Sequence, residues 1–131
     1  MAKKKLVTPK ELDNLISVGS PQINPDGSQI LYTRKCVKDG NNHTTIWVAH
    51  TKSTKVPREL TTNGKDGMPR WSPDGSVLSF QSERGDDSNS TWFVRVTTPG
   101  GEAHHVPGVD GTPIWSPDGM WIAYTKKPSR E

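Results

Sequence analysis

One five-residue sequence, Trp-Ser-Pro-Asp-Gly, occurs twice in this chain, beginning at Trp71 and at Trp115. A looser copy, Ile-Asn-Pro-Asp-Gly, begins at Ile23. The three copies align on a preceding proline at positions 21, 69 and 113, so they recur at intervals of 48 and 44 residues. Self-similarity at this period is typical of repeat folds, and a propeller blade has this length.

Each copy is predicted to form a β-hairpin. Ile23, Trp71 and Trp115 end a first strand, and the Pro-Asp-Gly turn follows, because proline presets φ, aspartate binds the turning backbone and glycine tolerates a positive φ. The turn residues are Pro25, Asp26 and Gly27 in the first copy, Pro73, Asp74 and Gly75 in the second, and Pro117, Asp118 and Gly119 in the third. An alternating second strand follows each turn, and this alternation is typical of a half-buried strand.

Further strands are predicted between the hairpins. Residues 44–50 and 90–96 are rich in β-branched and aromatic side chains, and the shorter segments 58–61 and 102–106 follow them. Trp47 and Trp92 take the same strand position, which indicates packing between blades. Each full repeat therefore has four sequential strands, which is the composition of one propeller blade.

The predicted fold is all-β: a partial β-propeller of about two and a half four-stranded antiparallel blades. Its expected divisions are an N-terminal arm with a short helix (1–20), blade one (21–66), blade two (67–110) and half of blade three (111–131). The helix is expected over residues 8–16, with Thr8 as N-cap and Glu11 completing a capping box. Leu12, Leu15 and Ile16 share one face of it.

Composition fits this fold and excludes several functions. Hydrophobic residues are only 30% of the chain, and 12 glycines and 11 prolines suit short strands joined by tight turns. Much of the net charge of +3 comes from Lys3, Lys4 and Lys5, and no basic stripe with interleaved aromatics indicates nucleic-acid binding. No apolar run reaches the roughly 20 residues of a membrane span, and the basic start lacks the apolar core of a secretory signal. Cytoplasmic residence is therefore expected.

No catalytic, cofactor-binding or metal-binding residue is predicted. Asp26, Asp74 and Asp118 could form a ring of carboxylates around a cation, but turn chemistry explains them better. His104 and His105 are adjacent in a strand and point to opposite faces. The acidic segment 83–89 lacks the spacing of a calcium-binding loop. Cys36 is the only cysteine, so no intrachain disulfide is possible, and no CxxC motif accompanies it.

Residues 6–33, which begin Leu-Val-Thr-Pro-Lys-Glu-Leu-Asp, together with the repeated Pro-Arg-Trp-Ser-Pro-Asp-Gly and Pro-Ile-Trp-Ser-Pro-Asp-Gly segments, resemble a known family. They are similar to the propeller domain of prolyl oligopeptidase-type serine peptidases, in particular the acylaminoacyl-peptidase and dipeptidyl-peptidase branches, and to the WD-like repeats of TolB-type propellers. In that family the propeller covers a separate hydrolase domain with a Ser-Asp-His triad. The triad serine lies in a G-x-S-x-G pentapeptide, which this sequence does not contain.

Two and a half blades leave apolar faces open at both ends, and such faces usually mark interaction sites. Trp71 or Trp115 and their neighbours on the following strand are expected on these faces. A C2 homodimer would close a six-bladed ring, with the third blade completed by the partner's N-terminal segment 3–8. We therefore expect a non-catalytic half-propeller scaffold that assembles with itself and, if it takes a ligand, binds protein or peptide. The alternative is the substrate-gating propeller of a serine peptidase whose hydrolase domain is absent.

Overall fold

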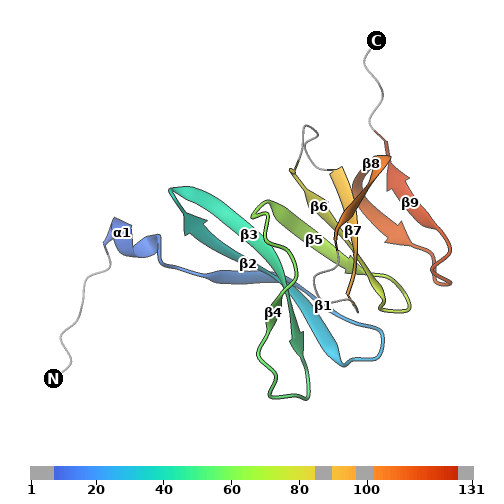
Figure 1. The fold of residues 1–131 in the computed structure, drawn as a ribbon, viewed down its shortest axis with the longest axis horizontal. Coiled ribbons are helices and arrows are strands. Elements are labelled where there is room, and N and C mark those ends of the chain that lie inside the picture. Colours follow the sequence, from blue (N-terminus) through green and yellow to red (C-terminus); the bar gives the residue numbers. More distant parts are fainter. Residues whose placement is uncertain (1–7, 85–89, 97–101, 127–131) are drawn as a thin grey trace, which may run out of the picture.

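The computed structural model describes residues 8–84, 90–96 and 102–126, which form two antiparallel sheets and one short helix (Figure 1). The first sheet contains, in spatial order, β1 (Ser17–Ile23), β2 (Gln29–Lys38), β3 (Asn41–His50) and β4 (Arg58–Glu59). The second contains β5 (Asp66–Trp71), β6 (Val77–Ser82), β7 (Ser90–Arg95), β8 (His104–Trp115) and β9 (Ile122–Thr125). In both sheets, sequential strands are spatial neighbours, so the predicted all-β class and its antiparallel meanders are confirmed.

The helix α1 (Pro9–Leu12) is shorter than the predicted 8–16. Its start agrees with the expectation, because Thr8 is the N-cap and Glu11 completes the capping box, with its Oε2 2.9 Å from the Thr8 backbone nitrogen. The chain leaves the helix after one turn because no neighbouring element covers its apolar side chains. Leu12, Leu15 and Ile16 are all more than half exposed.

The hydrophobic core lies between the two sheets. Leu31, Ile46 and Val48 project from β2 and β3 of the first sheet, and all three are at most 2% exposed. From the second sheet they meet Trp71, Leu78, Phe80, Val94 and Val96. Because side chains alternate along a strand, one face of each sheet is apolar toward its neighbour. This is face-to-face stacking of two blades.

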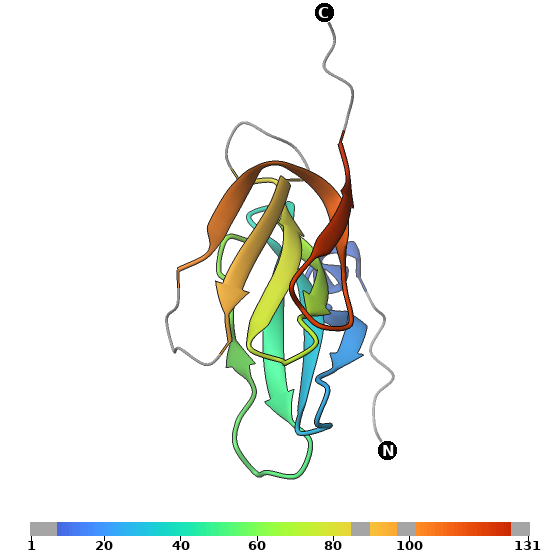
Figure 2. The same ribbon diagram turned by 90° about the vertical axis from the view of Figure 1, so that its right-hand side faces the viewer.

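The end of the second repeat differs from the expectation. The strand predicted over 102–106 begins at His104 and continues without a break to Trp115, where it pairs with β9. Figure 2 shows β8 arching over the second sheet toward β9. Gly108 and Gly111, with φ of 81° and 75°, let the strand bend instead of ending. The second sheet therefore has five strands, and the division of the chain into blades at residues 66 and 110 stays a prediction.

The side chains at the open end are not the ones expected. The sequence predicts Trp71 or Trp115 on the open faces. Trp71 is only 9% exposed between the sheets, where its Nε1 donates to the Gln22 carbonyl at 3.0 Å. Trp115 is half-buried, and its Nε1 donates to Ser79 Oγ at 3.3 Å. The open face of the first sheet instead presents Val18 (69% exposed) together with the half-buried Ile30 and Tyr32. At the other end of the chain, Met120 and Trp121 are 77% and 73% exposed.

Candidate functional site

The three Pro-Asp-Gly turns share one hydrogen-bond pattern. In the second turn, Asp74 Oδ1 accepts from the Ser76 backbone nitrogen at 3.0 Å and from Ser72 Oγ at 2.7 Å. Asp26 and Asp118 accept equivalent backbone hydrogen bonds of 2.8 and 3.0 Å from Ser28 and Met120. The glycines Gly27, Gly75 and Gly119 have φ between 73° and 75°. Each repeated aspartate therefore binds its own turn.

These hydrogen bonds lower the pKa of all three carboxyls. The backbone N–H of Ser76 is the largest cause for Asp74, with the hydroxyls of Ser72 and Ser76 adding to it, and the pKa falls to about 2. The Ser28 side chain is the largest cause for Asp26, and the Ser116 side chain is the largest cause for Asp118. Neutral hydrogen-bond donors thus stabilise all three carboxylates as anions. The three aspartates therefore have a structural role in their turns.

One turn position was missed by the sequence reasoning. Ser72 Oγ accepts from the Val77 backbone nitrogen at 3.0 Å, and Ser116 Oγ makes the same bond to Trp121. In the first copy Asn24 makes the equivalent hydrogen bond, with its Oδ1 accepting from the Gln29 backbone nitrogen at 2.9 Å. The signal was available, because a residue with a short polar side chain precedes the turn proline in every copy.

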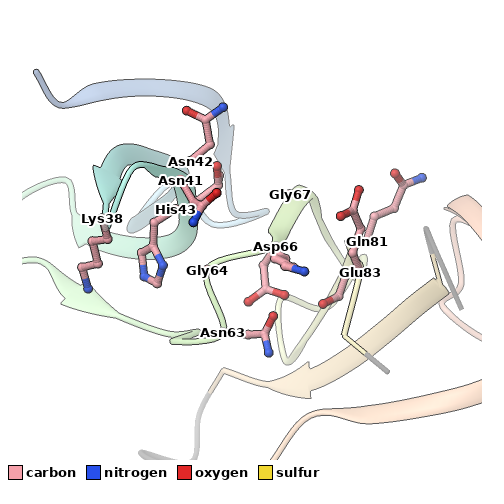
Figure 3. A pocket seen from close by; sticks show the side chains of 13 residues that line it. Lys38, Asn41, Asn42, His43, Asn63, Gly64, Asp66, Gly67, Gln81 and Glu83 are labelled. Carbon is pink, nitrogen blue, oxygen red and sulfur yellow. The ribbon is translucent and has the colours of Figure 1, made fainter. Parts of the chain in front are cut away.

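A polar pocket of about 720 Å³ lies at the opposite ends of the strands from these turns, where the two sheets adjoin (Figure 3). Lys38 and His43 line it from the first sheet, and Asp66 and Gln81 line it from the second. Asn63 and Gly64 line it from the loop that joins the sheets. Within the part of the chain that the structure describes, no three His, Cys, Asp or Glu side chains gather as a metal site would require.

Asp66, the buried acid of this pocket, is paired with an arginine. Both carboxylate oxygens of the fully buried Asp66 lie 2.8 Å from Arg84 Nη2. Arg84 Nε also donates to Ser82 Oγ, and its guanidinium lies 5.2 Å and 5.0 Å from the ring centres of Phe80 and Trp92. The pair ties β5 to the end of β6. It therefore stabilises the second sheet and occupies the Asp66 carboxylate, while Glu83 and His43 also line the pocket.

Two residues that line the pocket, His43 and Gly64, pack directly against each other. Gly64 has a φ of 87°, and its carbonyl accepts from the Thr44 nitrogen at 2.7 Å. A β-carbon on Gly64 would lie 2.1 Å from His43 Nδ1, so the imidazole packs directly against this glycine. His43 therefore holds the connection between the sheets, and we assign the pocket a structural role.

The other candidate residues lie apart from one another. His105 stacks on Trp92 with ring centres 5.3 Å apart, while His104 is exposed and pairs with Phe93 across the strands. Cys36 is half-buried and lies opposite His43. Trp92 packs against the core between the sheets, whereas Trp47 is half-buried beneath Arg34 on the open face. Lys3–Lys5, the N-terminal segment 3–7 and residues 85–89 of the acidic segment lie outside the described residues.

A second repeated feature was not recognised in the sequence. Each strand that leads into a Pro-Asp-Gly turn has an irregular register at a Gly-x-Pro sequence: β1 at residues 19–21, β5 at 67–69 and β8 at 111–113. Ser20 and Met68, the middle residues of the first two, have positive φ values of 49° and 50°. These are β-bulges, which bend a strand and re-aim the side chains beside it. No helix among the described residues is long and apolar enough to cross a bilayer.

Comparison with known proteins agrees with this architecture. The chain is 36% identical over 108 residues to the uncharacterized peptidase YuxL of Bacillus subtilis (strain 168). Its fold is similar to that of the Pyrococcus horikoshii acylaminoacyl peptidase, with a TM-score of 0.62 and 15% identity over 82% of this chain. The predicted resemblance to peptidase-related propellers is confirmed.

The similarity covers one part of these proteins. The match takes in 81% of this chain and 16% of YuxL, and the structural match covers 16% of the Pyrococcus protein. The chain thus spans about one sixth of the length of each. No family model matches it.

Proposed function

We propose that this chain is a non-catalytic segment of a peptidase-type propeller, which helps to restrict access to a hydrolase site. One observation carries the proposal: a stack of two antiparallel meanders with an apolar face left open. The similarity to two peptidases over about one sixth of their lengths supports the peptidase context.

The chemistry of the described residues fits a structural role. The repeated acids are hydrogen-bonded within their own turns, and the buried carboxylate of Asp66 is paired with Arg84. A serine peptidase needs a nucleophile within reach of a base and an oxyanion hole, and the sequence contains no G-x-S-x-G pentapeptide. The part played by the chain is therefore to position blades around a channel.

A hydrolysis assay tests the absence of catalysis. The purified chain, incubated with chromogenic N-acylated and N-terminally free dipeptide substrates, is expected to release no product above the buffer rate. Turnover that a serine-directed inhibitor abolishes would contradict the proposal.

A second candidate is a self-assembling scaffold, in which a second copy supplies the missing blades. The exposure of apolar side chains near both ends of the described chain, at Val18 and Trp121, favours it. Joining these ends in two copies would close a six-bladed ring about a two-fold axis, with protein or peptide as its ligand. The two candidates differ in the mass of the isolated chain in solution.

A further inference from the structure

The innermost strands, which are β1, β5 and the end of β8, each lead into a Pro-Asp-Gly turn and carry a groove between their ends. Pro25, Ser72 and Pro73 of the turns also line it. It measures about 680 Å³ and is lined by the ends of β1, β5 and β8. Trp71 and Trp115 line it, and their indole nitrogens are held by the Gln22 carbonyl and by Ser79 Oγ at 3.0 and 3.3 Å. In a propeller the innermost strands surround the axial channel, so completing the ring would leave this surface open to the channel.

Comparing the three copies of the repeat shows which residues around the groove are the same in each copy and which differ. All three copies keep a proline, at Pro21, Pro69 and Pro113. The residue directly after this proline differs in every copy, as Gln22, Arg70 and Ile114, and all three line the groove. The same backbone position thus places an amide, a cation and an aliphatic side chain side by side. Variation on a constant framework is how loop-bearing scaffolds acquire specificity.

Arg70 is the charged member, and no carboxylate in the part of the chain that the structure describes is paired with it. The half-buried guanidinium makes one hydrogen bond, from Nη1 to the Pro69 carbonyl at 2.9 Å. By contrast, Arg84 is paired with Asp66 and Arg34 lies over Trp47. None of the described residues that line the groove is acidic.

The acids nearest to Arg70 in the sequence are Asp66 and Asp74, and Asp66 does not compete for it because it pairs with Arg84. Asp26 and Asp74 each direct an oxygen to the serine two residues later in their own turns. Arg70 therefore keeps unused N–H donors in a geometry that suits a carboxylate.

We propose that this groove binds a peptide carboxylate, with Arg70 as its ligand. Gln22 offers an amide to the peptide backbone, and Ile114, which is 72% exposed, offers apolar contact to a neighbouring side chain. β1 and β5 are the edge strands of their sheets, and edge strands present unpaired backbone groups that an extended peptide can join. The inference does not depend on which protein supplies the remaining blades.

Titration calorimetry with three short peptides tests this site. The first is N-acetylated, apolar and has a free C-terminus; the second is its C-terminal amide; the third is the amide with one internal glutamate. The two carboxylate peptides are expected to bind about tenfold or more tightly than the uncharged amide, since a hydrogen bond to a charged group contributes that much. The stronger of the two shows whether the carboxylate is terminal or on a side chain.

Variants assign the effect to the groove. Arg70→Gln is expected to reduce the preference for carboxylate to less than twofold while leaving amide binding unchanged, and Arg70→Lys is expected to restore part of it. Arg95→Gln, at an exposed position of β7, is the matched control and should keep the full preference. Equal binding of acid and amide, no binding of any peptide, or the same loss in Arg95→Gln as in Arg70→Gln would overturn the proposal.

Discussion

At the scale of single residues, the repeated aspartate works through its own backbone. Asp74 accepts from Ser72 and Ser76 and has a pKa of about 2, below the ordinary value near 4. Because the pKa is lower in the folded state, the carboxylate stabilises the fold fully above about pH 4. This contribution is lost as the pH falls toward 2.

A pH series tests this role. Asp74→Asn should lower the urea midpoint at pH 7, and the difference from the parent should shrink below pH 4 and vanish near pH 2. Glu102→Gln, an exposed change outside the turns, is the control and should leave the midpoint unchanged throughout. A difference that stays constant from pH 7 to pH 2 would show that the charge of Asp74 is not what stabilises the turn.

Replacing Arg84 should greatly reduce the free energy of unfolding. Arg84→Met leaves the Asp66 carboxylate buried without a partner, which costs about 3–5 kcal/mol in comparable buried pairs. Arg95→Met, at an exposed site, should change the free energy of unfolding by less than about 0.5 kcal/mol. Urea denaturation of the two variants provides the comparison, and a similar small loss in both would contradict the assigned role of the ion pair.

At the scale of elements, the connection between the sheets depends on a glycine. Gly64 combines a positive φ with direct contact to His43, whereas Gly40 has a similar φ and open space around it. Gly40→Ala should therefore cost only the backbone strain, about 1–2 kcal/mol. Gly64→Ala should cost clearly more.

Thermal unfolding of both glycine variants checks this difference. In a His43→Ala background, Gly64→Ala should cost only about as much as Gly40→Ala does in the parent, because the clashing imidazole is already absent. Equal losses in the two single variants would show that the packing of His43 contributes nothing.

Some of the secondary-structure elements could be predicted from the sequence and others could not. Hairpins around Pro-Asp-Gly follow from local chemistry, so their number and order were predictable. The length of α1 was not, because it depends on what covers the helix after the chain folds. The continuity of β8 was not, because a glycine with positive φ can serve a bend in a strand as well as a turn between strands. The Asp66–Arg84 pair joins residues 18 positions apart, so no local pattern shows it, whereas the Gly-x-Pro bulges were visible as a repeat and were missed.

At the scale of the whole molecule, two sheets stack face to face, and the outer face of the first sheet is left open. Ile30 and Tyr32 occupy the repeat positions of Leu78 and Phe80, and the latter two are fully buried against the first sheet. Equivalent positions should serve equivalent contacts, so we propose that the open face of the first sheet receives another blade. Among the residues that the structure describes, its apolar side chains have no such partner.

A charged substitution tests that face. Tyr32→Lys should prevent association of the chain with other blades, because it places a charge in an apolar contact, while the fold of the single chain is retained. Size-exclusion chromatography with circular dichroism measures both properties. Lys35→Tyr, at an exposed position of the same strand, is the control and should associate like the parent.

The mass of the isolated chain in solution tests the central claim most directly. Sedimentation equilibrium at micromolar concentration should give twice the chain mass of 14.5 kDa if a second copy closes the ring, or larger assemblies if blades of a longer protein are missing. Either result agrees with a propeller segment whose open face needs a partner. A stable, well-folded monomer of 14.5 kDa would contradict the account.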